Sequence, residues 1–198
     1  MEHSAVGILP IAVNSLGLPY PDALFPLAYD TVLIDSTLEQ LNKLEIEAAY
    51  IVAQPIIIDK IANAIQYMRR GIDIRYLPVP YDTPLDYLAY AIRGCRHAST
   101  RYAFDRFIVS DPRAYYALDI SKQLLAHAHA TYTTVPGLLL LNDTAVTQLR
   151  RHQKTFDSTT CLREVLGNIP FDVQSDGYTL DTWAHIKVGG PIADSRWI

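Results

Sequence analysis

The sequence predicts a three-layer α/β protein with a mainly parallel central sheet and helices on both faces. Short apolar runs alternate with segments of helical spacing along the chain, and no internal repeat or domain linker interrupts them. Strands that alternate with helices require crossover connections, which make neighbouring strands parallel and place helices on both faces of the sheet. We therefore expect a single domain over residues 1–198.

The first element is an apolar run at residues 5–12, which predicts a strand. Residues 13–25 form a loop rich in turn-forming residues, and a helix follows from Leu33, with Ile34, Leu38 and Leu41 on one face. In an open α/β sheet, the loop after the first strand is a usual position for a phosphate-bearing ligand.

The later elements follow the same alternation. We expect a helix from Asp59, which can cap it, to Tyr67, after the run Ile56-Ile57-Ile58. Another helix should carry Leu85, Leu88, Ala91 and Ile92. Further strands are expected at 47–54, 72–78, 106–110, 131–134 and 138–141, further helices at 118–130, 144–151 and 158–166, and a tail with apolar segments at 171–173 and 177–183.

Composition and charge exclude several classes of protein. A hydrophobic content of 49% with 19% charged residues excludes a disordered chain, and a net charge of −4 disfavours non-specific nucleic-acid binding. Two cysteines, Cys95 and Cys161, make neither a disulfide framework nor a CxxC metal site. No secretory signal or membrane-length apolar run is visible, so we expect a cytoplasmic protein without membrane contact.

The loop at residues 13–25 lacks positive charge. No Lys or Arg occurs between Met1 and Asn42, and the one charged residue of the loop is Asp22. Phosphate-binding loops commonly add a cation to their backbone N–H groups. Here only the N–H groups around Asn14, Ser15 and Gly17 could form an anion-binding nest, which makes these residues the nucleotide-binding candidates.

The order of segments resembles that of the nucleotide-sugar pyrophosphorylase (nucleotidyltransferase) family, whose domain has a glycosyltransferase-A-like α/β fold. The likeness runs over nearly the whole chain. The matching segments are Ile8-Leu9 with the following loop, Leu-Phe-Pro-Leu at 24–27 followed by Leu-Ile-Asp-Ser-Thr-Leu at 33–38, Phe-Ile-Val-Ser-Asp at 107–111, the stretch 118–127, Gly-Leu-Leu-Leu-Leu at 137–141 and Tyr-Thr-Leu-Asp-Thr-Trp at 178–183.

This resemblance implies a nucleotide or sugar-phosphate ligand and a magnesium ion held by Asp111 and Asp181. Both residues follow apolar strands, so both could lie at the carboxyl edge of the sheet. The alternative is purely structural: Asp111 caps a turn before Pro112, and Asp181 caps the segment that follows it.

The departures from the family pattern fall on residues that carry the chemistry. The family loop reads Gly-x-Gly-Thr-Arg and then Pro-Lys, whereas this chain has Asp22 at the Lys position and Ser110 in place of the Gly of Gly-Asp. Losing both cations should remove several kcal/mol of transition-state stabilisation, so transfer should be very slow or absent. Placing Arg at Leu16 and Lys at Asp22 should then strengthen triphosphate binding. Arg113 is the candidate substitute cation, with a solvated surface Arg as the alternative.

A local group of basic residues offers a second, weaker candidate site. Its members are Arg93, Arg96, His97, Arg101 and Arg106. Helical spacing puts the first three on one face, which suits phosphate or an acidic partner, or simply a solvated surface. His127 and His129 are spaced for a metal only in an extended segment, and helical periodicity argues for ordinary surface and packing histidines instead.

Three functions fit these observations. The first is a divergent nucleotidyltransferase-like protein that handles a sugar or alcohol phosphate with magnesium. The second is a non-catalytic regulatory or binding subunit of the same fold, in a homo- or hetero-oligomer. The third is a metal-dependent glycosyltransferase, in which Asp111 would bind a donor diphosphate through the metal. The cation-free loop favours the second function, and the two retained aspartates favour the first.

Overall fold

The computed structural model describes residues 5–12, 20–26, 31–46, 48–65, 71–83, 86–110, 112, 114–115, 132–135, 138–152 and 178–179. The strand order of its main sheet is β3-β2-β1-β4-β7-β6. The strands are β1 (Ala5–Ile11), β2 (Ala48–Ala53), β3 (Asp73–Pro78), β4 (Arg106–Ser110), β6 (Tyr132–Val135) and β7 (Leu138–Asn142). The first four of the sheet order are parallel, whereas β7 is antiparallel to both of its neighbours.

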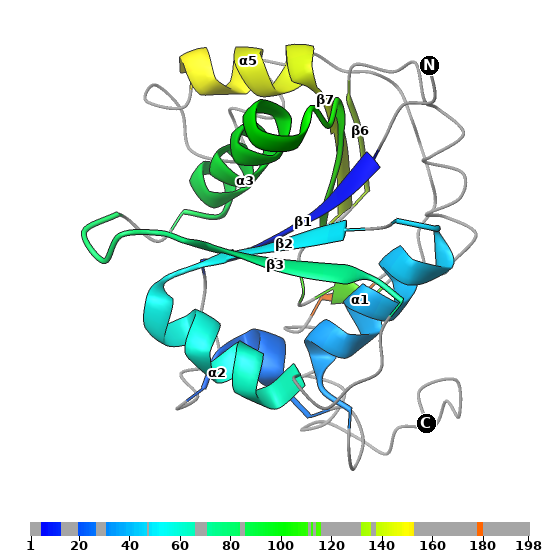
Figure 1. The fold of residues 1–198 in the computed structure, drawn as a ribbon, viewed down its shortest axis with the longest axis vertical. Coiled ribbons are helices and arrows are strands. Elements are labelled where there is room, and N and C mark those ends of the chain that lie inside the picture. The colour runs from blue at the N-terminus through cyan, green and yellow to red at the C-terminus, as the bar shows by residue number, and fades with distance from the viewer. Residues whose placement is uncertain are drawn as a thin grey trace.

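Helices cover both faces of this sheet (Figure 1), as the sequence predicted. One face carries α1 (Leu33–Lys43) and α2 (Pro55–Ile65), with the 3-10 turn η1 (Asp22–Leu24) beside them. The other face carries α3 (Tyr87–Tyr102) and α5 (Asp143–His152). A short antiparallel pair, β5 (Ala114–Tyr115) and β8 (Tyr178–Thr179), forms a second sheet. The three-layer α/β fold with a mainly parallel sheet is therefore confirmed.

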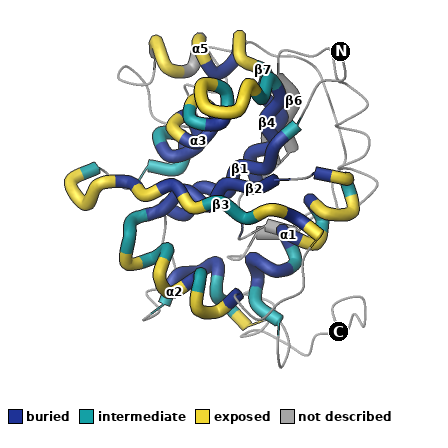
Figure 2. Tube along the Cα trace, in the orientation of Figure 1, coloured by how far each residue is buried: buried dark blue, intermediate teal, exposed yellow. Residues whose placement is uncertain are grey.

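The central strands are buried on both faces, which explains why they read as continuous apolar runs (Figure 2). Alternate residues of β1 supply the two cores: Ile8 packs on the α3 side, and Leu9 packs on the α1 and α2 side. Most predicted strands match the observed ones to within about two residues. Among the described helices, none is both long and apolar enough to cross a membrane.

The predicted start of α2 at Asp59 is wrong, because the helix begins at Pro55. The Gln54 carbonyl accepts from the N–H groups of Ile57 and Ile58 at 2.9 and 3.0 Å. Proline suits the first helical position, where its missing N–H has no intrahelical role. The isoleucine run therefore belongs to the first turn of the helix, and Ile56 is 52% exposed.

Helix α3 is longer than the pattern of apolar residues indicated. The Asp86 side chain caps it by accepting from the Ala89 N–H at 2.9 Å, and the helix continues to Tyr102, where Ala103 adopts a left-handed conformation at φ 56°. The predicted helices at 118–130 and 158–166 lie outside the described residues.

Candidate functional site

The chain changes direction across the sheet at β1. From β1 it proceeds outward through β2 to β3, and α3 then returns it to β4 on the other side of β1. Such a reversal of strand order is a topological switch point, and ligands of open α/β sheets bind outside the carboxyl ends of the strands at this point. The ends of β1 and β4 therefore define the candidate site.

The hydrogen-bonded ladders that β1 forms with β2 and with β4 end at different residues of β1. The ladder with β2 continues to the pair Ile11 and Ala53, whereas the described pairs with β4 end at Ile8 and Val109. Pro10 lies in the intervening stretch and has no N–H to donate. Among the described strands, the last residues of β1 are thus held by β2 rather than by β4.

The described residues that end or directly follow β1, β3 and β4 at this edge of the sheet are uncharged. Ala12 follows β1, Val79 follows β3 and Ser110 ends β4, and all three are buried. The Val79 N–H donates to the Ala53 carbonyl at 2.8 Å, which ties the exit of β3 to that of β2. These strand ends therefore offer apolar surface and backbone groups where a phosphate would need positive charge.

The described end of the loop after β1 is tied to α1. The Leu33 N–H donates to the Phe25 carbonyl at 2.9 Å, and the Val32 N–H donates to the Asp35 carboxylate at 2.9 Å. The second contact satisfies one of the N–H groups at the start of the helix. Asp22 lies in η1 and is only 1% exposed, beside α1 and α2.

The burial of Asp22 corrects the expectation that Lys could be introduced at this position. An ammonium group there would have to leave water, which costs far more than one charge-assisted contact returns. The position is therefore not equivalent to a solvent-facing loop Lys.

Most of the predicted site residues lie outside the described part of the chain. These are Asn14, Ser15, Gly17, Asp111, Arg113 and Asp181, and also His127 and His129. Their proposed roles thus remain predictions. Within the described ranges, no group of three His, Cys, Asp or Glu residues could hold a metal ion.

The basic residues of α3 and β4 do not form one patch. Arg93 is exposed and donates to the Pro78 carbonyl at 3.3 Å, near the carboxyl end of β3. Arg106 is 8% exposed inside β4, so it does not belong to an exposed basic surface with the α3 residues. It lies at the amino end of β4, opposite the switch point.

Sequence reasoning missed an aromatic group beside β3. The Arg75 guanidinium lies 4.2 Å from the ring centroid of Tyr102, and its Nη1 donates to the Tyr50 hydroxyl at 3.1 Å. The Arg75 Nε also bonds Asp73 at 2.7 Å. His97 belongs to this group, with its ring centroid 5.6 Å from that of Tyr50. The hydrogen bond to Tyr50 is the main reason that the pKa of Arg75 is raised.

Tyr90, in the second turn of α3, is a further residue that the sequence did not mark. The residue is 0% exposed, and its hydroxyl has no hydrogen-bond partner among the described residues. Burial raises the pKa of this hydroxyl. Because Tyr90 follows the helical spacing of the apolar positions, the sequence pattern alone assigns it to the core.

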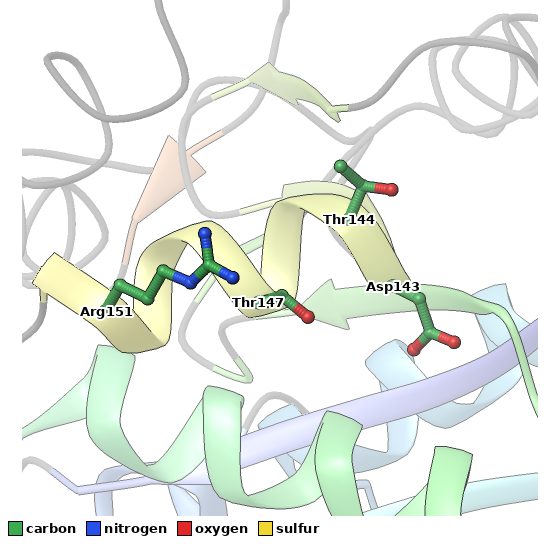
Figure 3. A pocket seen from close by; sticks show the side chains of 4 residues that line it. All are labelled: Asp143, Thr144, Thr147 and Arg151. Carbon is green, nitrogen blue, oxygen red and sulfur yellow. The ribbon is translucent and has the colours of Figure 1, made fainter.

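A pocket of about 320 Å³ lies on α5 rather than at the switch point. Asp143, Thr144, Thr147 and Arg151 line it, and Figure 3 shows their side chains projecting from this one helix. Since β7 runs antiparallel to β4, the start of α5 lies at the amino edge of the parallel strands. The Asp143 carboxylate there accepts from the Ser99 hydroxyl at 3.3 Å.

No protein-family model matches the chain, and no curated protein matches it. Solved structures do. A candidate glucose-1-phosphate thymidylyltransferase from Bacillus anthracis, solved in complex with a sucrose, has a TM-score of 0.56 at 10% identity, over 82% of this chain and 80% of its own.

Two further structures agree. A UDP-glucose pyrophosphorylase complexed with UDP-glucose has a TM-score of 0.55 at 11% identity, over 74% of this chain and 79% of its own. HddC from Yersinia pseudotuberculosis, complexed with GMP-PN, has a TM-score of 0.50 at 14% identity, over 65% and 56%. At these identities the likeness establishes a shared fold: this chain has a nucleotidyltransferase-like α/β fold.

Proposed function

We propose that the chain binds a nucleotide or a sugar phosphate at the switch point between β1 and β4, and catalyses nucleotidyl transfer very slowly or not at all. The observation that carries this proposal is the neutral carboxyl edge. The described residues that end or directly follow β1, β3 and β4 there are apolar or uncharged, and no Lys or Arg occurs before Lys43 in the sequence. The fold supports the position of the ligand, and the charge distribution argues against rapid chemistry.

The missing cations have a large energetic consequence. A triphosphate carries about four negative charges at neutral pH, and each charge-assisted contact contributes roughly 1.5–3 kcal/mol. Two lost contacts thus correspond to roughly three decades in rate if they act in the transition state. The pattern therefore favours ligand binding without efficient turnover.

Phosphate binding would then depend on backbone N–H groups and a metal ion. In this proposal the N–H groups around Asn14, Ser15 and Gly17 contact the phosphates. Asp111, which directly follows Ser110 at the end of β4, and Asp181 supply the carboxylate oxygens that Mg²⁺ prefers. When bound, the ion would neutralise phosphate charge that no loop side chain neutralises.

Two arginines are alternatives as phosphate cations. Arg113 is two residues beyond Asp111 in the sequence. Arg93 bonds Pro78 at the end of β3, which lies two strand spacings, or roughly 10 Å, from β1. Arg93 would therefore have to leave Pro78 to reach a phosphate at the switch point, and Arg113 is the better candidate.

Calorimetric titration with the four nucleoside triphosphates, with and without Mg²⁺, tests the proposal. We expect weak binding of at least one nucleotide that Mg²⁺ strengthens. Asp111→Asn and Asp181→Asn should each abolish the effect of Mg²⁺, while Asp59→Asn, a change on the exposed surface of α2, should leave it unchanged. Absence of binding to every nucleotide and to glucose 1-phosphate would contradict the proposed function.

Binding without turnover is also what a regulatory subunit requires. We therefore extend the proposal to assembly with a second copy or with an active partner of the same fold. Light scattering of the purified chain, with and without nucleotide, measures the homo-oligomer directly. Mg²⁺-dependent release of glucose from UDP-glucose would favour the glycosyltransferase alternative instead.

A further inference from the structure

The buried Tyr90 hydroxyl marks the α3 side of the switch point. Helix α3 starts after the carboxyl end of β3 and ends before the amino end of β4, so it runs antiparallel to the strands it covers. Gly94 shows how α3 is aligned with the strands beneath it. A Cβ at this residue would lie 2.7 Å from Ile8 Cγ2 and 2.9 Å from Val52 Cγ2. The backbone of Gly94 therefore lies over the side chains of Ile8 and Val52, and Val52 is the residue of β2 that pairs with Pro10.

Tyr90 lies one helical turn before Gly94. Four helical residues rise about 6 Å, which is close to the span of about 6.6 Å from Ile8 to Pro10 along a strand. The backbone of Tyr90 is thus at the level of Pro10 or beyond it, past the last described pair of the β1–β4 ladder. Helical side chains lean toward the helix N-terminus, so the ring extends further toward the carboxyl edge.

The ring of Tyr90 lies in the apolar core on the α3 side of the sheet. Tyr90 belongs to the same buried cluster as Ala12 and Val79, the residues that follow β1 and β3. The cluster supplies apolar contacts for the ring. Its hydroxyl nevertheless lacks a hydrogen-bond partner among the described residues, although it is fully buried. A buried hydroxyl without a partner is unfavourable, and nearly all buried polar groups find a partner in protein or ordered water, a place that a polar ligand group can also take.

We propose that the Tyr90 hydroxyl forms a hydrogen bond with an uncharged polar group of the ligand at the switch point and so contributes to ligand selection. The inference rests on the proposed function. An uncharged partner is expected because the buried cluster that contains Tyr90 is apolar, and a phosphate within it would be desolvated without a counter-charge. A nucleobase edge and a sugar hydroxyl share the required chemistry.

Two matched substitutions separate this role from a structural one. Tyr90→Phe removes only the hydroxyl that has no described partner, whereas Tyr50→Phe removes a hydroxyl that accepts from Arg75 at 3.1 Å. Without ligand, Tyr90→Phe should unfold at the same temperature as the wild type or higher, because an unpaired buried hydroxyl is lost. Tyr50→Phe should unfold at a lower temperature and bind ligand as the wild type does.

Calorimetry with a nucleoside triphosphate and with glucose 1-phosphate completes the test. Tyr90→Phe should weaken one of them about three- to tenfold, the range expected for one neutral hydrogen bond. Loss confined to the triphosphate identifies the nucleoside, through its base or its ribose, as the partner, and loss confined to glucose 1-phosphate identifies a hydroxyl of the hexose. Unchanged affinity for both ligands overturns this inference alone, whatever the unfolding temperature of Tyr90→Phe. A wild-type chain that binds neither ligand overturns the proposed function as well.

Discussion

Gly94 of α3 lies against Ile8 of β1 so closely that a Cβ on Gly94 would stand 2.7 Å from Ile8 Cγ2. The close approach brings the helix down onto the two central strands. It also fixes the height of Tyr90 relative to the end of β1. The packing of one glycine thus links the core to the candidate site.

Gly94→Ala should destabilise the protein by about 1–2 kcal/mol. Two stiff β-branched neighbours, Ile8 and Val52, would have to move, and this cost exceeds the gain of about 1 kcal/mol in helix propensity. Denaturant unfolding measures the change. Gly71→Ala is the matched control, because an added Cβ there meets only the end of the exposed Asn42 side chain, and its effect should stay within about 0.5 kcal/mol. Equal effects of the two substitutions would show that the approach of α3 is not tight.

Arg75 should stabilise the attachment of β3 to the body of the sheet. Arg75→Met removes the hydrogen bonds to Tyr50 and Asp73 and the contact with the Tyr102 ring, and should cost about 1–2 kcal/mol. A double-mutant cycle with Tyr50→Phe should give a coupling energy of about 1 kcal/mol. Arg93→Met, which removes a longer bond from an exposed residue, should cost less than about 0.5 kcal/mol. Additive effects of Arg75→Met and Tyr50→Phe would argue against a direct bond.

Stability should fall in alkaline solution, and Cys95 should be the first cause. Burial raises the pKa of the Cys95 thiol, so the folded chain keeps a proton that the unfolded chain loses above about pH 8.5. The unfolding free energy then falls as pH rises, by about 1.4 kcal/mol per unit for this group. Denaturant titrations at pH 8 and pH 10 measure it. Cys95→Ala should reduce the fall by about 2 kcal/mol, and an unchanged fall would assign it to other groups.

Asp22→Lys should damage the fold rather than improve phosphate binding. The side chain is 1% exposed, so the new ammonium would be buried beside α1 and α2. We expect a loss of several kcal/mol in unfolding free energy, measured by denaturant titration. Asp22→Asn, which keeps the shape and removes the charge, is the control and should cost less. A stable Asp22→Lys variant with increased triphosphate affinity would contradict this prediction and would mean that position 22 faces solvent.

The strands could be predicted because buried parallel strands read as short apolar runs between turn residues. The segment 106–110 was predicted with the bounds that β4 has. The start of α2 was missed because three isoleucines suit a strand as well as a helix. The sequence alone does not show that the Gln54 carbonyl accepts the first helical hydrogen bonds, which makes Pro55 the first residue of the helix. Local periodicity could not separate these alternatives.

The candidate site was predictable only in outline. The order of elements placed a ligand after the first strand, but the switch point follows from strand order, which the sequence does not display. Tyr90 escaped notice because only a three-dimensional contact reveals an unpaired hydroxyl in an apolar helix face. Arg106 was grouped with the basic residues of α3 because it is close to them in sequence, but it belongs to β4, whose residues are all buried.

The most direct test of the account is the rate of pyrophosphate release with each nucleoside triphosphate, glucose 1-phosphate and Mg²⁺, at ligand concentrations that calorimetry shows to saturate binding. The account predicts that the chain binds at least one of these ligands but releases pyrophosphate at or near the rate of a blank without protein. Turnover in the usual enzymatic range, about 1 s⁻¹ or faster, would contradict it. Such a rate would mean that a cation from elsewhere, with Arg113 the first candidate, performs the task that no residue before Lys43 can perform.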